Sequence, residues 1–111
     1  MVYEFAAKIK DIENEEMLEP EVGNAAVEEL MRKNGATFEI TLRHEKNSNK
    51  DMMVKGKVSV SSFSPLHERE LEDAISQFKK NLEEIAVLLG GKINENEAFY
   101  NNSKTFAKLY F

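Results

Sequence analysis

The clearest hydrophobic pattern in this chain runs from residue 64 to residue 91. Large apolar residues recur there at steps of three and four, the period of one face of an α-helix: Leu71, Ile75, Phe78, Leu82, Ile85 and Leu89. Ser64 followed by Pro65 is typical of a helix start, and Gly90-Gly91 of a helix end. The pattern predicts a helix about 38 Å long that needs an apolar surface of similar length beside it.

Strict alternation of apolar and polar residues predicts three strands, over residues 2–10, 36–45 and 52–62. Residues 46–51 have the composition of a turn, so the last two strands form an antiparallel hairpin. This hairpin offers the surface that the long helix requires, and the first strand pairs alongside it. Gly56 falls on the apolar face, where it marks a bulge or leaves room for a side chain from the helix.

The remaining segments are less regular. A short helix is expected to end at Asn34-Gly35, either capped by Asn24 or beginning as early as Pro20. Residues 11–21 are interpreted as a solvated connector or a frayed helix entry, and residues 92–97 as a polar link. The aromatic segment that follows could form a short helix, or a strand from Thr105 onward.

Together these elements predict a single α+β domain over residues 1–111. The expected sheet is mainly antiparallel, has three or four strands, and carries one long and one short helix on one face. The expected order is β-α-β-β-α, followed by the aromatic C-terminal segment. The chain has no cysteine, no recognisable signal at its first residues and no apolar run long enough for a membrane span, so we expect a cytoplasmic protein.

The sequence contains no glycine-rich nucleotide-binding motif and, without cysteine, no thiol nucleophile. His67 lies within helical reach of Glu68 and Glu72, but a solvated helix start explains these residues without a metal ion. Ser64 stands three residues before His67, and helix capping explains that serine without catalysis. We therefore expect no catalytic residues, no metal site and no cofactor.

Acidic residues are concentrated near the amino terminus of a chain whose net charge is −5. Residues 11–30 hold eight carboxylates and no basic residue. A solvated helix entry accounts for this pattern, but the same charges could dock on a basic partner protein and speed association. The candidate residues for this acidic patch are Glu13, Glu15, Glu16, Glu19 and Glu21.

Basic residues gather instead around the predicted hairpin. Lysines on exposed strands commonly protect a sheet against edge-to-edge aggregation, and they could also contact phosphates. The outward face of the hairpin lacks the aromatic rings that stack on bases, so nucleic-acid binding ranks second. The residues of this alternative are Arg43, Lys46, Lys50, Lys55 and Lys57.

Half of the aromatic residues lie in the last thirteen positions. This segment is expected to complete the core or to add an edge strand; otherwise it pairs with another subunit or another protein, with Phe106, Tyr110 and Phe111 as candidate contacts. The leading expectation is a small acidic, non-enzymatic protein-interaction module. Inhibitors, immunity proteins, chaperones and accessory factors of phage or mobile elements belong to this class. The partner is another protein, with a homodimer through an edge strand or the C-terminal segment also open.

Overall fold

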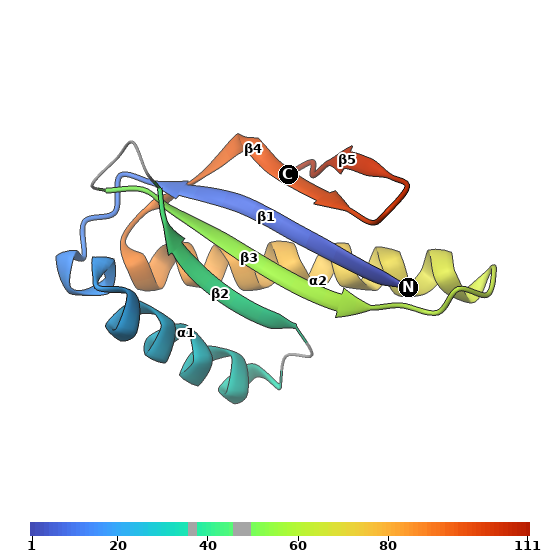
Figure 1. Cartoon of the computed structure of the whole chain (residues 1–111). Coiled ribbons are helices and arrows are strands. Elements are labelled where there is room, and N and C mark those ends of the chain that lie inside the picture. Colours follow the sequence, from blue (N-terminus) through green and yellow to red (C-terminus); the bar gives the residue numbers. More distant parts are fainter. Residues whose placement is uncertain (36–37, 46–49) are drawn as a thin grey trace.

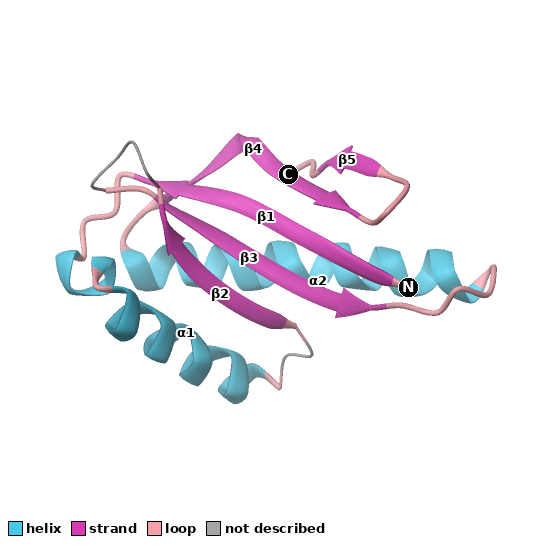
Figure 2. Cartoon of the chain, in the orientation of Figure 1, coloured by secondary structure: helices cyan, strands magenta, loops and turns pink. Residues whose placement is uncertain are grey.

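The computed structural model of this chain describes residues 1–35, 38–45 and 50–111. It has two layers, a sheet of five antiparallel strands and two helices that lie on the same face of that sheet (Figures 1 and 2). The elements in chain order are β1 (Val2–Lys10), η1 (Glu15–Leu18), α1 (Pro20–Asn34), β2 (Glu39–His44), β3 (Met52–Ser59), α2 (Leu66–Leu89), β4 (Lys92–Asn101) and β5 (Phe106–Lys108).

The strands lie in the order β2-β3-β1-β4-β5, and every neighbouring pair is antiparallel. Without β5, this is the split β-α-β (ferredoxin-like) arrangement, in which each helix connects two parallel strands that have a third strand between them. The α+β class and the two helices on one face agree with the prediction. The sheet has five strands, at least one more than the three or four that were expected.

The strand absent from the prediction is β4, which begins in the segment 92–97 that the sequence predicts to be a polar link. Lys92 and Ile93 pair with the end of β1, and pairing resumes at Ala98 after an irregularity in the register. The polar residues between them hide the period of two on which strand prediction depends. The strand alternative for the C-terminal segment is confirmed, since β5 pairs with β4.

The apolar stripe of α2 forms the centre of the core. Phe78, Leu82, Ile85 and Leu89 are fully buried, as the helical pattern predicted. The surface beneath them differs from the expected one, because α2 packs against β1, β3 and β4 while α1 covers β2. The long helix therefore does not lie on the β2-β3 hairpin alone (Figure 2). Strand β1, inserted between β3 and β4, supplies much of the apolar surface.

Both predicted helix caps are wrong, although both predicted helix ends are confirmed. Helix α2 begins at Leu66 with no side-chain cap, so Ser64 does not cap it. Helix α1 begins at Pro20, the alternative start, which places Asn24 inside the helix. At the other ends, Gly35 and Gly90 adopt left-handed conformations with φ of 64° and 67°, which glycine tolerates without strain.

Most of the predicted turn over residues 46–51, and the start of the predicted strand at residues 36–37, lie outside the described residues. Within the described part of the chain, neither helix is long and apolar enough to cross a membrane.

Candidate functional site

The face of the sheet opposite the helices is open to solvent and is called here the open face. Cross-strand partners point to the same side of a sheet, so the register identifies its side chains. Phe5 and Ala7 of β1 are buried toward the helices, which leaves Glu4 and Ala6 on the open face. Two rows of partners cross the sheet there: Thr41, Lys55, Ala6, Phe99 and Lys108; and Glu39, Lys57, Glu4, Asn101 and Phe106.

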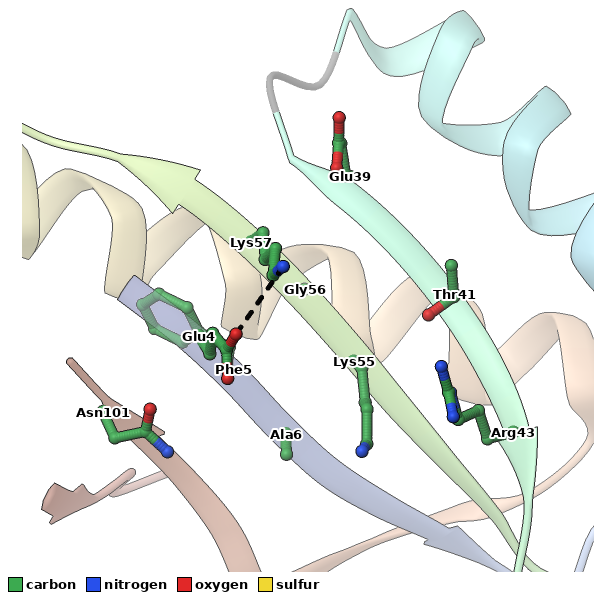
Figure 3. A pocket seen from close by; sticks show the side chains of 10 residues that line it. All are labelled: Glu4, Phe5, Ala6, Glu39, Thr41, Arg43, Lys55, Gly56, Lys57 and Asn101. Atoms are coloured by element: carbon green, nitrogen blue, oxygen red, sulfur yellow. Dashed lines mark ion pairs between the residues drawn. The ribbon is translucent and has the colours of Figure 1, made fainter. Parts of the chain in front are cut away.

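The open face is hollowed at its centre. Ala6, the smallest side chain of these rows, lies in the middle of a depression of about 450 Å³. Figure 3 shows the side chains that surround it, with Arg43 and Thr41 from β2, Lys55 and Lys57 from β3, and Glu4 from β1. Half of the ten residues that line it are charged, two of them acidic and three basic, so the depression is suited to a charged ligand rather than to a purely apolar one.

Two of the cations near this depression are already paired. The Lys57 amine lies 3.7 Å from the Glu4 carboxylate. The Lys8 amine lies 3.1 Å from the Glu97 carboxylate and 3.8 Å from that of Glu45. The hydrogen bond to Glu97 is the main reason that the pKa of Lys8 is raised above its ordinary value.

Arg43 and Lys55 differ from these lysines. Both are exposed, and among the described residues neither forms an ion pair. Arg43 is the register partner of Met53, two residues before Lys55, so the two cations are diagonal neighbours beside one depression (Figure 3). Glu39 also lines the depression and forms no ion pair among the described residues, but Arg43 and Lys55 together outnumber it, so the unpaired charge there favours an anionic ligand.

Aromatic rings also lie on this face, but they come from β4 and β5. The outward residues of the β2-β3 hairpin itself include no aromatic ring in the described part of the chain, as expected. Phe99 of β4 and Phe106 of β5 stack with their ring centroids 5.0 Å apart and an interplanar angle of 29°. Phe106 remains 68% exposed. Asn101, its register partner, and Lys108, the partner of Phe99, place an amide and an amine beside the rings.

Sequence reasoning named Phe106 only as a contact with another subunit or protein. It missed Phe99, and the shared face of the two rings, because it did not assign β4 to the sheet. One signal was present in the sequence. Residues 98–101 alternate, with Ala98 and Tyr100 packing toward the core and Phe99 and Asn101 pointing outward. The alternation is too short to predict a strand by itself when polar residues precede it.

Of the five residues predicted for nucleic-acid contact, the structure brings three together. Arg43, Lys55 and Lys57 surround the same depression. Lys50 is exposed at the far end of the hairpin, where its carbonyl accepts a hydrogen bond from the Ile12 amide, and it is not part of the depression. Lys46 lies outside the described residues.

The acidic patch lies elsewhere, at one end of the molecule (Figure 1). Its five carboxylates, on Glu13, Glu15, Glu16, Glu19 and Glu21, are all exposed, and within the described part of the chain none forms an ion pair. Backbone hydrogen bonds from residues 13 and 14 to the carbonyls of Gly90 and Leu89 hold this segment against the end of α2.

The C-terminal segment completes the core and adds an edge strand, as expected. Leu109 is buried and completes the core, whereas Phe106, Tyr110 and Phe111 are 68%, 74% and 43% exposed. Lys79 of α2 donates a hydrogen bond to the Tyr110 carbonyl and lies 5.7 Å from the centre of the Phe111 ring. The segment is therefore held to the body of the protein while its rings face solvent.

His67 has both ring nitrogens engaged. Nδ1 donates to the Ser61 carbonyl at 2.8 Å, and Nε2 lies 3.0 Å from the Tyr3 hydroxyl. These bonds tie the start of α2 to β1 and to the segment that follows β3, a structural role. Among the described residues, no three histidine, aspartate or glutamate side chains are close enough to hold a metal ion together.

The open face therefore presents unpaired cations, stacked rings and an amide on one surface. Such a combination can bind a ligand that is anionic and also has planar rings. Comparison with protein-family models, with curated proteins and with solved structures finds no match to this chain. The interpretation of the site rests on its geometry, because a fold by itself does not specify a function.

Proposed function

We propose that this chain is a non-enzymatic, cytoplasmic binding module that holds single-stranded nucleic acid on the open face of its sheet. One observation carries the proposal: the stacked Phe99 and Phe106 rings share this face with the unpaired cations Arg43 and Lys55. A single strand supplies both groups that these side chains recognise, because its bases expose their flat faces and its phosphates carry charge.

Each part of the face then has a separate role. A base stacks on the exposed ring of Phe106, and the Asn101 amide beside it can donate to or accept from the edge of that base. Arg43 and Lys55 contact phosphates, and Lys57 joins them if a phosphate displaces the Glu4 carboxylate. A duplex fits this face poorly because its bases stack on one another and hide the surfaces that the rings would cover.

The net charge of −5 limits how strong this binding can be. With about three phosphates neutralised, the logarithm of the association constant should fall with the logarithm of salt concentration with a slope of about −2. Binding should therefore be measured first at low ionic strength, where the phosphate contacts are least screened.

The test uses fluorescence anisotropy of labelled thymidine and uridine oligonucleotides with the full chain. Reversing both charges in Arg43→Glu/Lys55→Glu should weaken binding by at least about tenfold, because two phosphate contacts become repulsions. The matched control, Lys33→Glu/Lys80→Glu, makes the same change in net charge on exposed residues of α1 and α2 and should weaken binding far less.

The aromatic contribution is tested by Phe106→Ala, which should reduce affinity by about fivefold or more, since stacking contributes about 1–3 kcal/mol per base. Phe63→Ala is its control, because Phe63 is also highly exposed, at 77%, but precedes α2 in the loop after β3. The proposal fails if neither oligonucleotide binds at low salt, or if each control variant weakens binding as much as its counterpart.

The acidic patch favours a second candidate function, docking on a basic partner protein as an inhibitor or accessory factor would. Its support is the set of five exposed carboxylates at one end of the molecule, none of which pairs with a cation of the described residues. Replacing Glu15, Glu16 and Glu19 with lysine should release such a partner in a pull-down read by mass spectrometry, without lowering thermal stability. A partner retained by this triple variant would exclude the acidic patch as its docking site.

A further inference from the structure

The two edges of the sheet are protected very differently. At the β2 edge, the Asn24 side chain of α1 pairs with the backbone of Leu42: Oδ1 accepts from the Leu42 amide at 2.8 Å, and Nδ2 donates to the Leu42 carbonyl at 3.2 Å. The side-chain amide thus occupies the groups that a neighbouring strand would bind. Helix α1 also packs along this strand.

The β5 edge has no such cover in the part of the chain that the structure describes. The Leu109 amide donates to the Ala98 carbonyl, and the Asn102 amide donates to the Thr105 carbonyl. Residue pairs in an antiparallel ladder alternate between hydrogen-bonded and non-hydrogen-bonded. Phe106 and Lys108 each stand one residue from a hydrogen-bonded pair, so their own pairs with β4 are non-hydrogen-bonded. Their backbone amide and carbonyl groups therefore point away from β4. These outward groups can pair with another strand.

We propose that β5 pairs with β5 of a second copy of this chain, antiparallel, about a two-fold axis at Ala107. With this register Phe106 lies opposite Lys108 of the second copy, and Lys108 lies opposite its Phe106. The outward amide and carbonyl groups of both residues are then used. Each lysine amine meets an aromatic ring rather than a like charge, a favourable cation–π arrangement.

Other symmetric registers of this strand are poorer. An axis at Lys108 places two lysines opposite each other, and an axis at Phe106 leaves the outward groups of Lys108 unpaired. Ala107 at the proposed axis is small, so the strands can approach closely. Tyr110, which is 74% exposed and lies beside the depression formed by Ile75, Tyr100 and Ala107, adds apolar surface that association removes from water.

The axis is perpendicular to the sheet, so both open faces lie on the same side of the dimer. The stacked Phe99 and Phe106 rings of one copy then lie near those of the other. A continuous sheet through both copies would double the surface proposed above for a single strand. The proposed dimer is formed by the β5 edge alone, so the dimer can be tested separately from nucleic-acid binding.

Sedimentation equilibrium of the full chain without nucleic acid tests the dimer, from low micromolar to several hundred micromolar concentration, because a short paired edge makes a small interface. A mass that rises toward the dimer is expected. Phe106→Lys places lysine opposite lysine in both pairs and should remove the dimer. Its circular dichroism spectrum should match the parent, since Phe106 is 68% exposed and lies outside the core.

The reciprocal exchange provides the decisive control. Phe106→Lys/Lys108→Phe again places each lysine opposite a phenylalanine of the second copy, so it should restore association at the parental concentration. If the parent has the mass of a monomer at every concentration, the proposal is overturned, even if a different protein pairs with the β5 edge. A dimer that survives Phe106→Lys, or an exchange variant that stays monomeric, also overturns it.

Discussion

Gly56 has no side chain, and two aromatic rings occupy the space beside its Cα. A Cβ atom at this position would lie 3.0 Å from the Phe78 ring and 3.2 Å from the Phe38 ring. These rings cannot move aside easily, because both pack against Phe5 with centroid distances of 4.9 and 5.4 Å. The register of β3 is continuous on both sides, so of the two roles predicted for this glycine the room for a helix side chain is confirmed and the bulge is wrong.

Gly56→Val should therefore destabilise the protein by about 1–3 kcal/mol through overpacking. Urea denaturation followed by circular dichroism measures the change. The double variant Gly56→Val/Phe78→Leu tests the cause, because the smaller leucine makes room for the valine. Its loss of stability should be smaller than the sum of the two single losses. A strictly additive result would show that contact with Phe78 is not the reason.

At the scale of elements, a single amide joins α1 to the edge strand β2. Besides its two bonds to Leu42, the Asn24 side chain donates to the Pro20 carbonyl of its own helix at 2.9 Å. Asparagine is a poor residue for the interior of a helix, since it bonds readily to the backbone. Here that property fixes the helix against a strand eighteen residues away.

Asn24→Ala should lower the free energy of unfolding by about 1–2 kcal/mol, because the unpaired Leu42 groups cost more than alanine gains in helix propensity. Hydrogen exchange should show a faster-exchanging Leu42 amide. Asn34→Ala is the matched control on the same helix, since Asn34 is exposed and its side-chain amide donates to the Glu84 carboxylate rather than to a strand. Equal losses in both variants would contradict a specific role for Asn24.

At the scale of the molecule, the charges are separated. The open face carries unpaired cations, while the acidic patch lies at the end where residues 13 and 14 meet the end of α2. A protein with a net charge of −5 can thus hold a local surface that attracts anions. The acidic patch should weaken the proposed nucleic-acid binding only when salt is low, because the screening length is about 8 Å at physiological ionic strength.

Replacing Glu15, Glu16 and Glu19 with glutamine takes the net charge from −5 to −2. This triple variant should bind a single-stranded oligonucleotide more tightly than the parent at low salt and equally well near physiological salt. Anisotropy titrations at the two salt concentrations measure the difference. Tighter binding by the triple variant at both salt concentrations would mean that the carboxylates touch the oligonucleotide directly. The assignment of the binding face would then be wrong.

Much of this protein follows from the sequence alone, because short-range periodicity encodes it. The burial of Phe78 and Leu82, the helix ends at Gly35 and Gly90, and the extended state of β1, β2 and β3 each depend on neighbouring residues. The class α+β followed from the same patterns. So did the exposure of the acidic patch.

The tertiary structure decided what depends on pairs of distant residues. Strand β4 exists because β1 offers its backbone to a polar segment, and that pairing brings Phe99 and Phe106 onto the face that already carries Arg43 and Lys55. Asn24 acquires its role only when β2 lies beside α1. Strand order, the open face and the unprotected edge are properties of long-range contacts, and a pattern read along one chain carries no direct record of them.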